Sequence, residues 1–319
     1  MPRKIVQSKV KTHGTAAARA RTGSRARSTP PTISGRWILG ALAGVVAVAA
    51  LCVWLVLCLL FWQGSWQLLY HPSATVAKTP SSASLAFDPI DFATTGAGVP
   101  QLCGWWIPAA SDSRYSRYTV LYLHRQDGNL GDTIPALAQL HETGVNVFAF
   151  DYRGYGQSKF AHPSEANWLE DAGWALDYLT NTRHIDPHTI VVYGWNLGAD
   201  LALEFAASHP ELAGVVANMP MKEALTPLFG DERARLVPAH LLVRDRFDLD
   251  VAATGIQIPA LWLEFDPQAV NHDYDEPAAY QEIKSHKTLL WLAPSPHIDY
   301  DRTAAFTRWL DGLVPVLSR

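Results

Sequence analysis

A strand, a tight turn and a helix follow one another within residues 189–208, and this stretch limits the folds that the chain can adopt. Residues 190–193 are β-branched or aromatic, which favours a buried strand. The chain then turns through the sequence GWNLG at 194–198, and residues 199–206 repeat apolar side chains at helical spacing. The two glycines let strand and helix approach closely. The central side chain, Asn196, is therefore expected to project over the edge of a sheet, beside a helix N-terminus.

Strands and helices alternate along the chain from residue 85 onward. Apolar runs predict strands at 87–93, 102–107, 118–124, 145–151, 191–194, 214–218, 260–264 and 288–292. Helical spacing predicts helices at 134–142, 168–179 and 301–316 in addition to the one after the GWNLG turn. This alternation favours an α/β fold with one mostly parallel sheet and helices on both faces. Residues 220–255 form a connection longer than usual, so we expect a short cap there.

Residues 37–62 contain no charged side chain. As a helix this run would extend about 39 Å, which exceeds the ~30 Å hydrocarbon layer of a bilayer and the ~7–15-residue apolar core of a signal peptide. Aromatic residues lie at both of its ends, as is typical of a membrane span. We therefore expect a transmembrane helix at 37–62, a linker at 63–84 and the main domain at 85–319.

Charge is distributed unevenly along the chain. Residues 1–36 hold nine of the 26 Lys and Arg residues and none of the 30 acidic ones. This segment has few large apolar residues, so we expect it to be disordered. Its positive charge predicts a cytoplasmic N-terminus and an extracytoplasmic main domain, which is periplasmic if the source is a bacterium with an inner membrane. The main domain is acidic overall, which argues against nucleic-acid binding.

The composition also argues against a disulfide framework, a metal site or a nucleotide site. The three cysteines are Cys52 and Cys58, within the apolar run, and Cys103. Neither Cys/His spacing typical of a metal site nor a glycine-rich nucleotide motif occurs. We therefore expect no metal and no cofactor.

Several short motifs accompany the turn at 194–198. They are LLYHP at 68–72, GWWIP at 104–108, the strand end His124 with GN at 128–129, DYRGYGQS at 151–158, RDRFD at 244–248 and HID at 297–299. With these motifs, residues from about 66 to 313 resemble the membrane-anchored α/β-hydrolases of the serine aminopeptidase/lysophospholipase-like superfamily. The resemblance implies an α/β-hydrolase fold and a catalytic triad in the chain order nucleophile, acid, base.

The resemblance places Asn196 at the nucleophile position, where the family carries Ser. The nitrogen of a carboxamide is delocalised into its carbonyl and is a very poor nucleophile, so a histidine cannot activate it as it would a hydroxyl. Loss of the nucleophile alone typically lowers turnover on the order of a millionfold.

The other two members of the triad are assigned from their positions in the chain. His297 follows the last strand and precedes the final helix, which is where the base is expected. Asp266 follows the preceding strand and is the expected acid, and Glu264, Asp273 and Asp275 remain alternatives.

The oxyanion hole also departs from the family pattern. Its donors are expected to be the backbone N–H of Leu197 and one N–H from the loop after His124. The family carries Gly directly after that histidine, but here Arg125 and Gln126 follow. A β-carbon disfavours a backbone conformation with positive φ, and the guanidinium has the size to fill the pocket.

Two departures in one site predict lost or altered chemistry. We expect a membrane-anchored α/β-hydrolase relative that has lost serine-ester catalysis and binds a small acyl- or ester-like ligand or a protein partner. The alternative is an active hydrolase of esters, amides or lipids that uses a non-standard nucleophile. One such route is hydrolysis of Asn196 to Asp by a water that His297 activates.

Overall fold

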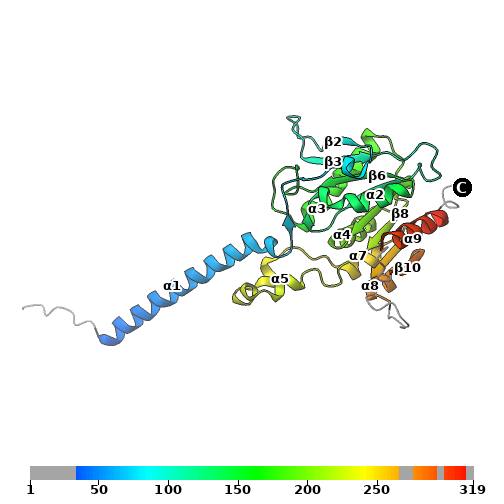
Figure 1. Ribbon diagram of the computed structural model, residues 1–319. Coiled ribbons are helices and arrows are strands. Elements are labelled where there is room, and N and C mark those ends of the chain that lie inside the picture. Colours follow the sequence, from blue (N-terminus) through cyan, green and yellow to red (C-terminus); the bar gives the residue numbers. More distant parts are fainter. Residues whose placement is uncertain (1–33, 266–275, 293–297, 314–319) are drawn as a thin grey trace, which may run out of the picture. The chain divides into compact units, whose positions relative to one another are not determined.

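The computed structural model describes residues 34–265, 276–292 and 298–313, and it describes side chains for 34–264, 276–292 and 303–313 (Figure 1). Its centre is an eight-stranded sheet in the order β10-β9-β8-β7-β4-β6-β3-β2. All neighbours from β6 to β10 are parallel, and β3 is antiparallel to both β2 and β6. The strands are β2 (Asp88–Phe92), β3 (Leu102–Ile107), β4 (Thr119–Leu123), β6 (Asn146–Asp151), β7 (Ile190–Trp195), β8 (Gly214–Asn218), β9 (Ala260–Phe265) and β10 (Lys287–Leu292).

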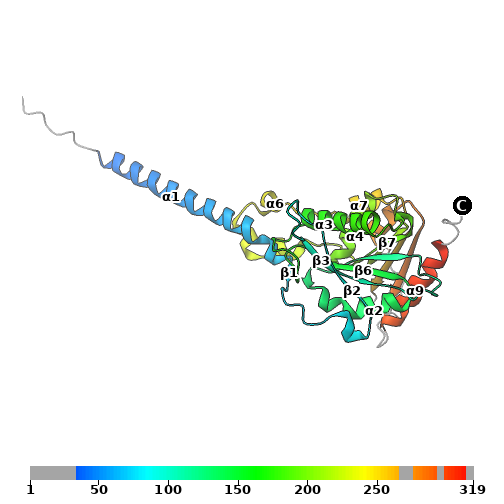
Figure 2. The ribbon, with the colours of Figure 1, turned by 90° about the horizontal axis from the view of Figure 1, so that it is seen from above.

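Helices cover both faces of this sheet (Figure 2). One face carries α3 (Glu165–Asp177), α4 (Leu197–Ala207), α7 (Leu249–Gly255) and α8 (Ala278–Glu282), and the other carries α2 (Ile134–Glu142) and α9 (Ile298–Leu313). Strand β4 is buried on both sides, because Leu121 and Leu123 pack in one core while Val120 and Tyr122 pack in the other. This two-sided burial explains the continuous apolar runs in the sequence. The predicted α/β-hydrolase architecture is confirmed.

Residues 63–84, expected to be a linker, are partly built into the domain. They contain the 3-10 helices η1 (Ser65–Leu68) and η2 (Pro80–Ala83) and the short strand β1 (His71–Pro72), which pairs in parallel with β5 (Asp127–Gly128). Leu69 and Tyr70 are buried in the core. The hydroxyl of Tyr70 donates a hydrogen bond to Asp245 at 2.8 Å. The pairing of β1 with β5 holds the loop that follows β4 against this segment.

The long connection between β8 and β9 contains several short helical segments. They are α5 (Thr226–Gly230), η6 (Glu232–Leu236) and α6 (Ala239–Leu242), followed by α7. A small apolar cluster holds this region together and consists of Phe61, Leu228, Ala234, Ala239 and Val243. We refer to residues 226–243 as the cap.

Helix α1 (Gly35–Gly64) is long and apolar. Among the described residues, Gly35–Leu68 is the helical stretch with the length and hydropathy of a membrane span, and an 18-residue window within it has a mean hydropathy of 2.9. A signal sequence near an N-terminus shares these properties. The chain divides into two compact units, residues 1–52 and 53–319, and the last turns of α1 belong to the second.

Candidate active site

Asn196 is the single residue between the end of β7 and the start of α4. Its backbone has φ 56° and ψ −124°, a region that non-glycine residues rarely occupy and that costs about 1–3 kcal/mol. Two backbone hydrogen bonds hold it there: its N–H donates to the carbonyl of Asn218 at 2.9 Å, and its carbonyl accepts from the N–H of Ala199 at 2.8 Å. The chain thus makes a strained strand-to-helix turn with Asn196 at its apex.

The two glycines of this turn are required by close backbone contacts. A β-carbon on Gly194 would lie 2.0 Å from the carbonyl oxygen of Gly198. A β-carbon on Gly198 would lie 2.4 Å from the carbonyl oxygen of Leu123 and 2.5 Å from that of His124. The N-terminus of α4 is therefore pressed against the ends of both β7 and β4, which brings the loop after β4 next to the turn.

The apex offers a carboxamide and a helix N-terminus. The side chain of Asn196 is half-buried and makes no capping hydrogen bond to α4. Leu197 is the first residue of α4, so its N–H has no acceptor within the helix and is available for an external oxygen. The position can polarise a bound carbonyl, but the Asn196 side chain has no hydroxyl to attack it.

Arg125 lies beside the turn. Its guanidinium carbon is 5.4 Å from the centre of the Trp195 ring, and its Nε is 3.9 Å from a carboxylate oxygen of Asp127. Neither Arg125 nor Gln126 is among the described residues with positive φ. Arg125 and Gln126 therefore avoid the conformation that glycine permits, and the cation rests against the residue that precedes Asn196.

Gln126 is held through its backbone. Its carbonyl accepts hydrogen bonds from the N–H of His71 at 3.0 Å and from the hydroxyl of Tyr155 at 2.8 Å. Its side-chain Oε1 is buried without a hydrogen-bond partner among the described residues. The contacts with β1 thus fix the second residue of the candidate oxyanion loop.

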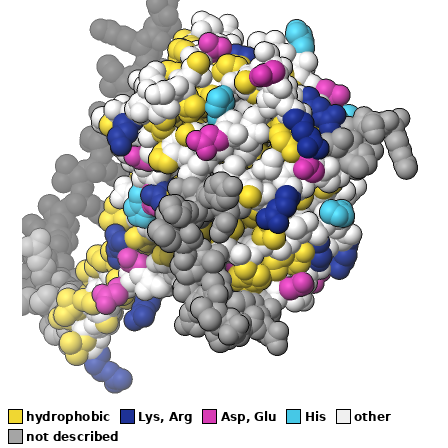
Figure 3. Space-filling view, turned by 45° about the vertical axis from the view of Figure 1, so that its right-hand side comes forward, with side chains coloured by type: hydrophobic (Ala, Val, Ile, Leu, Met, Phe, Trp, Pro, Cys, Tyr) yellow, Lys and Arg dark blue, Asp and Glu magenta, His cyan; other side chains and the backbone are white. Residues whose placement is uncertain are grey.

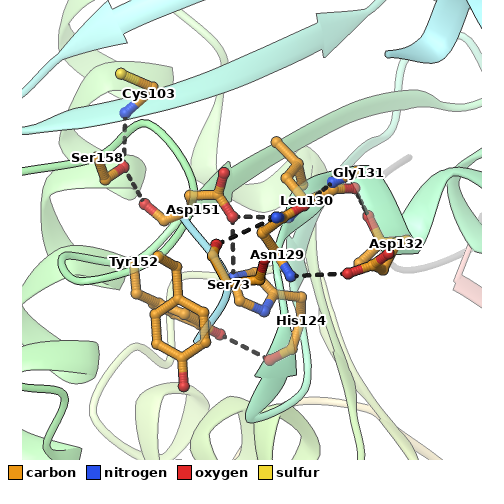
Figure 4. Close-up of polar contacts among 12 residues, drawn as sticks. Ser73, Cys103, His124, Asn129, Leu130, Gly131, Asp132, Asp151, Tyr152 and Ser158 are labelled. Carbon is orange, nitrogen blue, oxygen red and sulfur yellow. Dashed lines mark hydrogen bonds and ion pairs between the residues drawn. The ribbon is translucent and has the colours of Figure 1, made fainter. Parts of the chain in front are cut away.

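His124 forms a buried pair with Asp151 beneath that loop (Figure 4). Its Nδ1 lies 2.7 Å from the carbonyl oxygen of Arg125, so Nδ1 carries the proton of a neutral ring. Its Nε2 lies 3.7 Å from Oδ1 of Asp151. Burial lowers the pKa of His124 to about 4 and raises the pKa of Asp151 to about 7. We interpret His124 as a structural residue, because it is enclosed and electrically neutral.

Further polar contacts extend from this pair (Figure 4). Oδ1 of Asp151 accepts from the N–H of Leu130 at 2.7 Å. The Asn129 side chain donates to the carbonyl of Ser73 at 3.1 Å and accepts from the N–H of Gly131 at 2.8 Å. These contacts fix the loop after β4 to the segment after β1. In the sequence, Asp151 and Asn129 stand out only as parts of motifs, and these contacts were not predicted.

The expected acid and base cannot be placed. Asp266 and His297 lie outside the described residues, as do the alternatives Asp273 and Asp275. Glu264 is described, and its carboxylate accepts a hydrogen bond from the indole N–H of Trp262 at 3.0 Å. In the chain, Asp266 follows the end of β9 and His297 precedes the start of α9. Their roles remain predictions.

A cluster of carboxylates on and near α4 was not predicted from the sequence. Asp200 and Glu204 lie one and two turns after Asn196, and Glu165 begins α3. Asp200 is buried: one of its oxygens accepts from the N–H of Met221 at 2.8 Å, and the other has no hydrogen-bond partner among the described residues. Burial raises the pKa of Asp200 well above its usual value. Burial, followed by the charge of Glu165, raises the pKa of Glu204 to about 7.

These carboxylates do not form a metal centre. Within the described ranges, no group of three or more His, Cys, Asp or Glu side chains is arranged to hold a metal ion. The helical spacing of Asp200 and Glu204 was visible in the sequence. The burial of Asp200 was not, because it depends on a contact with the segment at Met221.

Comparison with known proteins gives consistent results. Residues 115–285 match the protein family described as serine aminopeptidase, S33. The uncharacterized protein YfhR of Escherichia coli K12 is 30% identical over 259 residues, which cover 80% of this chain and 86% of that protein. YfhR of Salmonella typhimurium is 28% identical over 244 residues, with coverage of 72% and 80%.

Solved structures resemble the fold. An esterase of Pyrococcus furiosus, Pf2001, aligns with a TM-score of 0.56 at 19% identity and covers 76% of this chain and 97% of its own. This likeness concerns the fold alone.

Proposed function

The chain belongs to the serine aminopeptidase S33 family of α/β-hydrolases, and we propose that it is a membrane-anchored member of this family that lacks serine-ester catalysis. In this proposal the domain binds a small acyl- or ester-like ligand or a protein partner. The observation that carries the proposal is the carboxamide of Asn196 at the apex of a strained strand-to-helix turn. Acyl transfer needs a deprotonatable nucleophile there, and an amide nitrogen does not supply one.

The position of Arg125 supports the same conclusion. Its stacking on Trp195 and the contacts of Gln126 with β1 hold these two residues in conformations without positive φ. A second donor that points at a developing oxyanion contributes about 10²–10³ in turnover in working enzymes. This chain lacks both the nucleophilic hydroxyl and a loop conformation that offers such a second donor. We therefore expect it to bind its ligand rather than to cleave it.

The proposal is tested with the whole chain. Phe61 packs in the cap cluster, and Leu69 and Tyr70 are buried, so truncation near residue 70 would expose apolar surface. The full-length protein in detergent is treated with a fluorophosphonate probe and a short-chain ester, and we expect no labelling and background turnover. The Asn196→Ser variant serves as the matched control and should become labelled at position 196. Labelling of the unaltered protein would reject the proposal.

The alternative is an active hydrolase with Asp at position 196. It is favoured by the retention of the strained backbone at Asn196, since strain of this kind persists where a site requires it. Peptide mass spectrometry across residue 196 separates the two versions. Conversion of the amide to a carboxylate in the purified protein supports the alternative, and an intact amide rejects it.

Membrane anchoring through residues 37–62 belongs to the proposal, with the N-terminus cytoplasmic and the main domain on the other side. Its support is the length and hydropathy of α1 together with the basic residues before it. Flotation with lipid vesicles and protease protection of an N-terminal tag in bacterial spheroplasts test the anchor and its orientation. Nucleic acid is not a proposed partner. On the face shown in Figure 3, Lys and Arg side chains are interspersed with Asp and Glu among the residues drawn in colour.

A further inference from the structure

We infer that the cavity between the last turns of α1 and the cap binds one acyl chain of a membrane phospholipid. The cavity has a volume of about 260 Å³ and lies within the unit formed by residues 53–319. This inference rests on the membrane anchoring in the proposed function and is independent of the chemistry at Asn196.

One wall of the cavity is a stripe along α1. Leu57, Leu60, Phe61 and Gly64 line it at the spacing of neighbours on one helix face. The opposite wall comes from the cap, through Leu236 and Val237. An apolar cavity binds apolar ligands rather than water. Its volume lies below the roughly 300–1,000 Å³ of pockets for drug-sized ligands, so a single narrow hydrocarbon chain is the occupant that fits.

Three polar residues also line the cavity. They are Ser65, Gln67 and Arg233, which together with Leu68 complete the lining, and Nε of Arg233 lies 2.8 Å from a carboxylate oxygen of Asp231. A second cavity of about 520 Å³ shares Ser65 with the first, and its lining includes His162 and Arg244. The second cavity is mixed in character, since Trp62, Trp66 and Leu242 line it together with these basic side chains and Asp245. A phospholipid whose acyl chain fills the first cavity would direct its headgroup toward this mixed one.

The position along α1 favours a lipid over other apolar occupants. The uncharged run 37–62 is about 39 Å long as a helix, and an inserted span uses about 30 Å of it. Its far end, with Trp62, therefore lies where acyl chains meet the headgroups. Trp54 lies about 12 Å before Trp62 along the helix, and its indole N–H donates to the carbonyl of Leu236 at 3.2 Å, so the cap reaches back along α1 from this end.

Two leucines of the cap are largely exposed. Glu232, Arg233 and Arg235 are exposed on the same segment, and Leu236 and Leu241 are 62% and 84% exposed. Contact with the bilayer surface would cover the two leucines. Leu236 also lines the cavity, so the apolar surface of the cavity reaches the exposed side of the cap, and lipid is the occupant present there in an anchored protein.

The experiment uses the full chain in nanodiscs of phosphatidylcholine that contain a phosphatidylcholine with a diazirine on one acyl chain. Irradiation followed by peptide mass spectrometry maps the crosslinked residues. We expect crosslinks on α1 and also on the cap segment at 233–237. Gly64→Phe fills the cavity without backbone strain, because Gly64 has φ −107° and ψ −8° and a β-carbon there meets no atom within 4 Å. It should lower the cap crosslinks about tenfold.

Two further variants test whether the cap crosslinks come from an acyl chain inside the cavity. Gly44→Phe makes the same change in α1 at a position where a β-carbon also meets nothing, and it should leave the cap crosslinks unchanged. Leu236→Gln, at an exposed side chain, makes the cavity wall polar and should lower the crosslinks to Val237 as Gly64→Phe does.

The outcomes separate the inference from the anchor. Crosslinks on α1 with none on the cap overturn the lipid site and leave the anchor standing. Cap crosslinks that persist unchanged in both Gly64→Phe and Leu236→Gln also overturn it, since they would reflect passing contact with the bilayer. Failure of the protein to enter nanodiscs or float with vesicles rejects the anchor itself.

Discussion

Arg125 stacks its guanidinium over the indole of Trp195, with 5.4 Å between the guanidinium carbon and the ring centre. A cation on an aromatic face is stabilised by about 0.5–1 kcal/mol at an exposed site and by more when water is excluded. Trp195 directly precedes Asn196, so this contact joins the loop after β4 to the apex of the strand-to-helix turn. The two departures from the family pattern are thus physically connected.

This connection predicts how activity responds to substitution. Asn196→Ser alone should give slow fluorophosphonate labelling, because Arg125 still holds the loop in its present conformation. Asn196→Ser combined with Arg125→Gly should label faster, by up to about 10²–10³-fold, as the loop becomes able to offer a second oxyanion donor. Labelling rates measure the effect, and Arg125→Gly alone is the control that should remain unlabelled. Equal rates for the single and double variants would refute a role for Arg125.

The glycines of the turn give a stability prediction. Gly198→Ala places a β-carbon within 2.5 Å of two backbone carbonyl oxygens, and neither can move without displacing β4. We expect a loss of about 3 kcal/mol or more in the free energy of unfolding, at the upper end for overpacked sites. Gly173→Ala, within α3 and with nothing near its β-carbon, is the matched control and should gain about 0.5–1 kcal/mol. Urea unfolding followed by tryptophan fluorescence measures both. Similar stability of the two variants would contradict the close packing.

The parts of the fold that were predicted from sequence are those encoded locally. Strands β4, β6 and β7 are buried on both faces, so their residues form continuous apolar runs that stand out in the sequence. The turn at Asn196 was equally readable, because glycines at 194 and 198 are required by contacts within a few residues and with β4. The order of the strands in the sheet is not encoded in this local way.

The features that were missed depend on contacts between distant segments. Tyr70 is buried where its hydroxyl donates a hydrogen bond to Asp245, 175 positions later. The sequence near residue 70 does not predict that partner. In the sequence, Asp200 resembles a solvated charge on a helix, because the contact with Met221 comes from a segment 21 positions later. The stacking of Arg125 on Trp195 likewise joins two loops. The acid and base, Asp266 and His297, remain predictions from chain order alone.

Glu165 provides a prediction about the segment that leads from the cap to α7. Its two carboxylate oxygens accept hydrogen bonds from the N–H groups of Arg246 and Phe247, both at 2.6 Å. Glu165→Ala leaves two partly buried donors unpaired, each at a cost of about 1–3 kcal/mol. We expect this segment to open more often in the variant, so trypsin should cleave faster after Arg244 and Arg246.

The control for this experiment is Glu170→Ala, on the same helix but with an exposed side chain. It removes an ion pair with Arg153 and should leave cleavage after Arg244 and Arg246 close to that of the unaltered protein. Glu165→Gln keeps one acceptor oxygen and should be intermediate. If Glu165→Ala were cleaved no faster than Glu170→Ala, the carboxylate would not be what holds this segment.

The buried pair of His124 and Asp151 predicts a pH dependence of stability. Burial, and to a lesser extent the charge of Asp132, raises the pKa of Asp151 to about 7, whereas an aspartate in the unfolded chain has a pKa of about 3.9. The folded state therefore binds an extra proton between these values. The resulting stabilisation is fully present below about pH 4 and is lost as the pH rises through about 7.

His124 contributes in the opposite direction. Its pKa is lowered to about 4 in the folded state from about 6.5 in the unfolded chain, so its contribution to stability is lost as the pH falls between those values. In the unaltered protein the two contributions partly cancel between about pH 4 and pH 6.5. In a variant whose residue 151 does not titrate, the contribution of His124 to the pH dependence of stability should no longer be cancelled.

Asp151→Asn makes this test, because the amide oxygen can still accept from the N–H of Leu130. The free energy of unfolding of the variant minus that of the unaltered protein should rise with pH, by at most about 1.4 kcal/mol per unit between pH 4 and pH 7. Urea unfolding at intervals across that range measures the difference, in which other buried acids such as Asp171 cancel. A difference that stays constant with pH would show that Asp151 is ionised in the folded protein throughout this range.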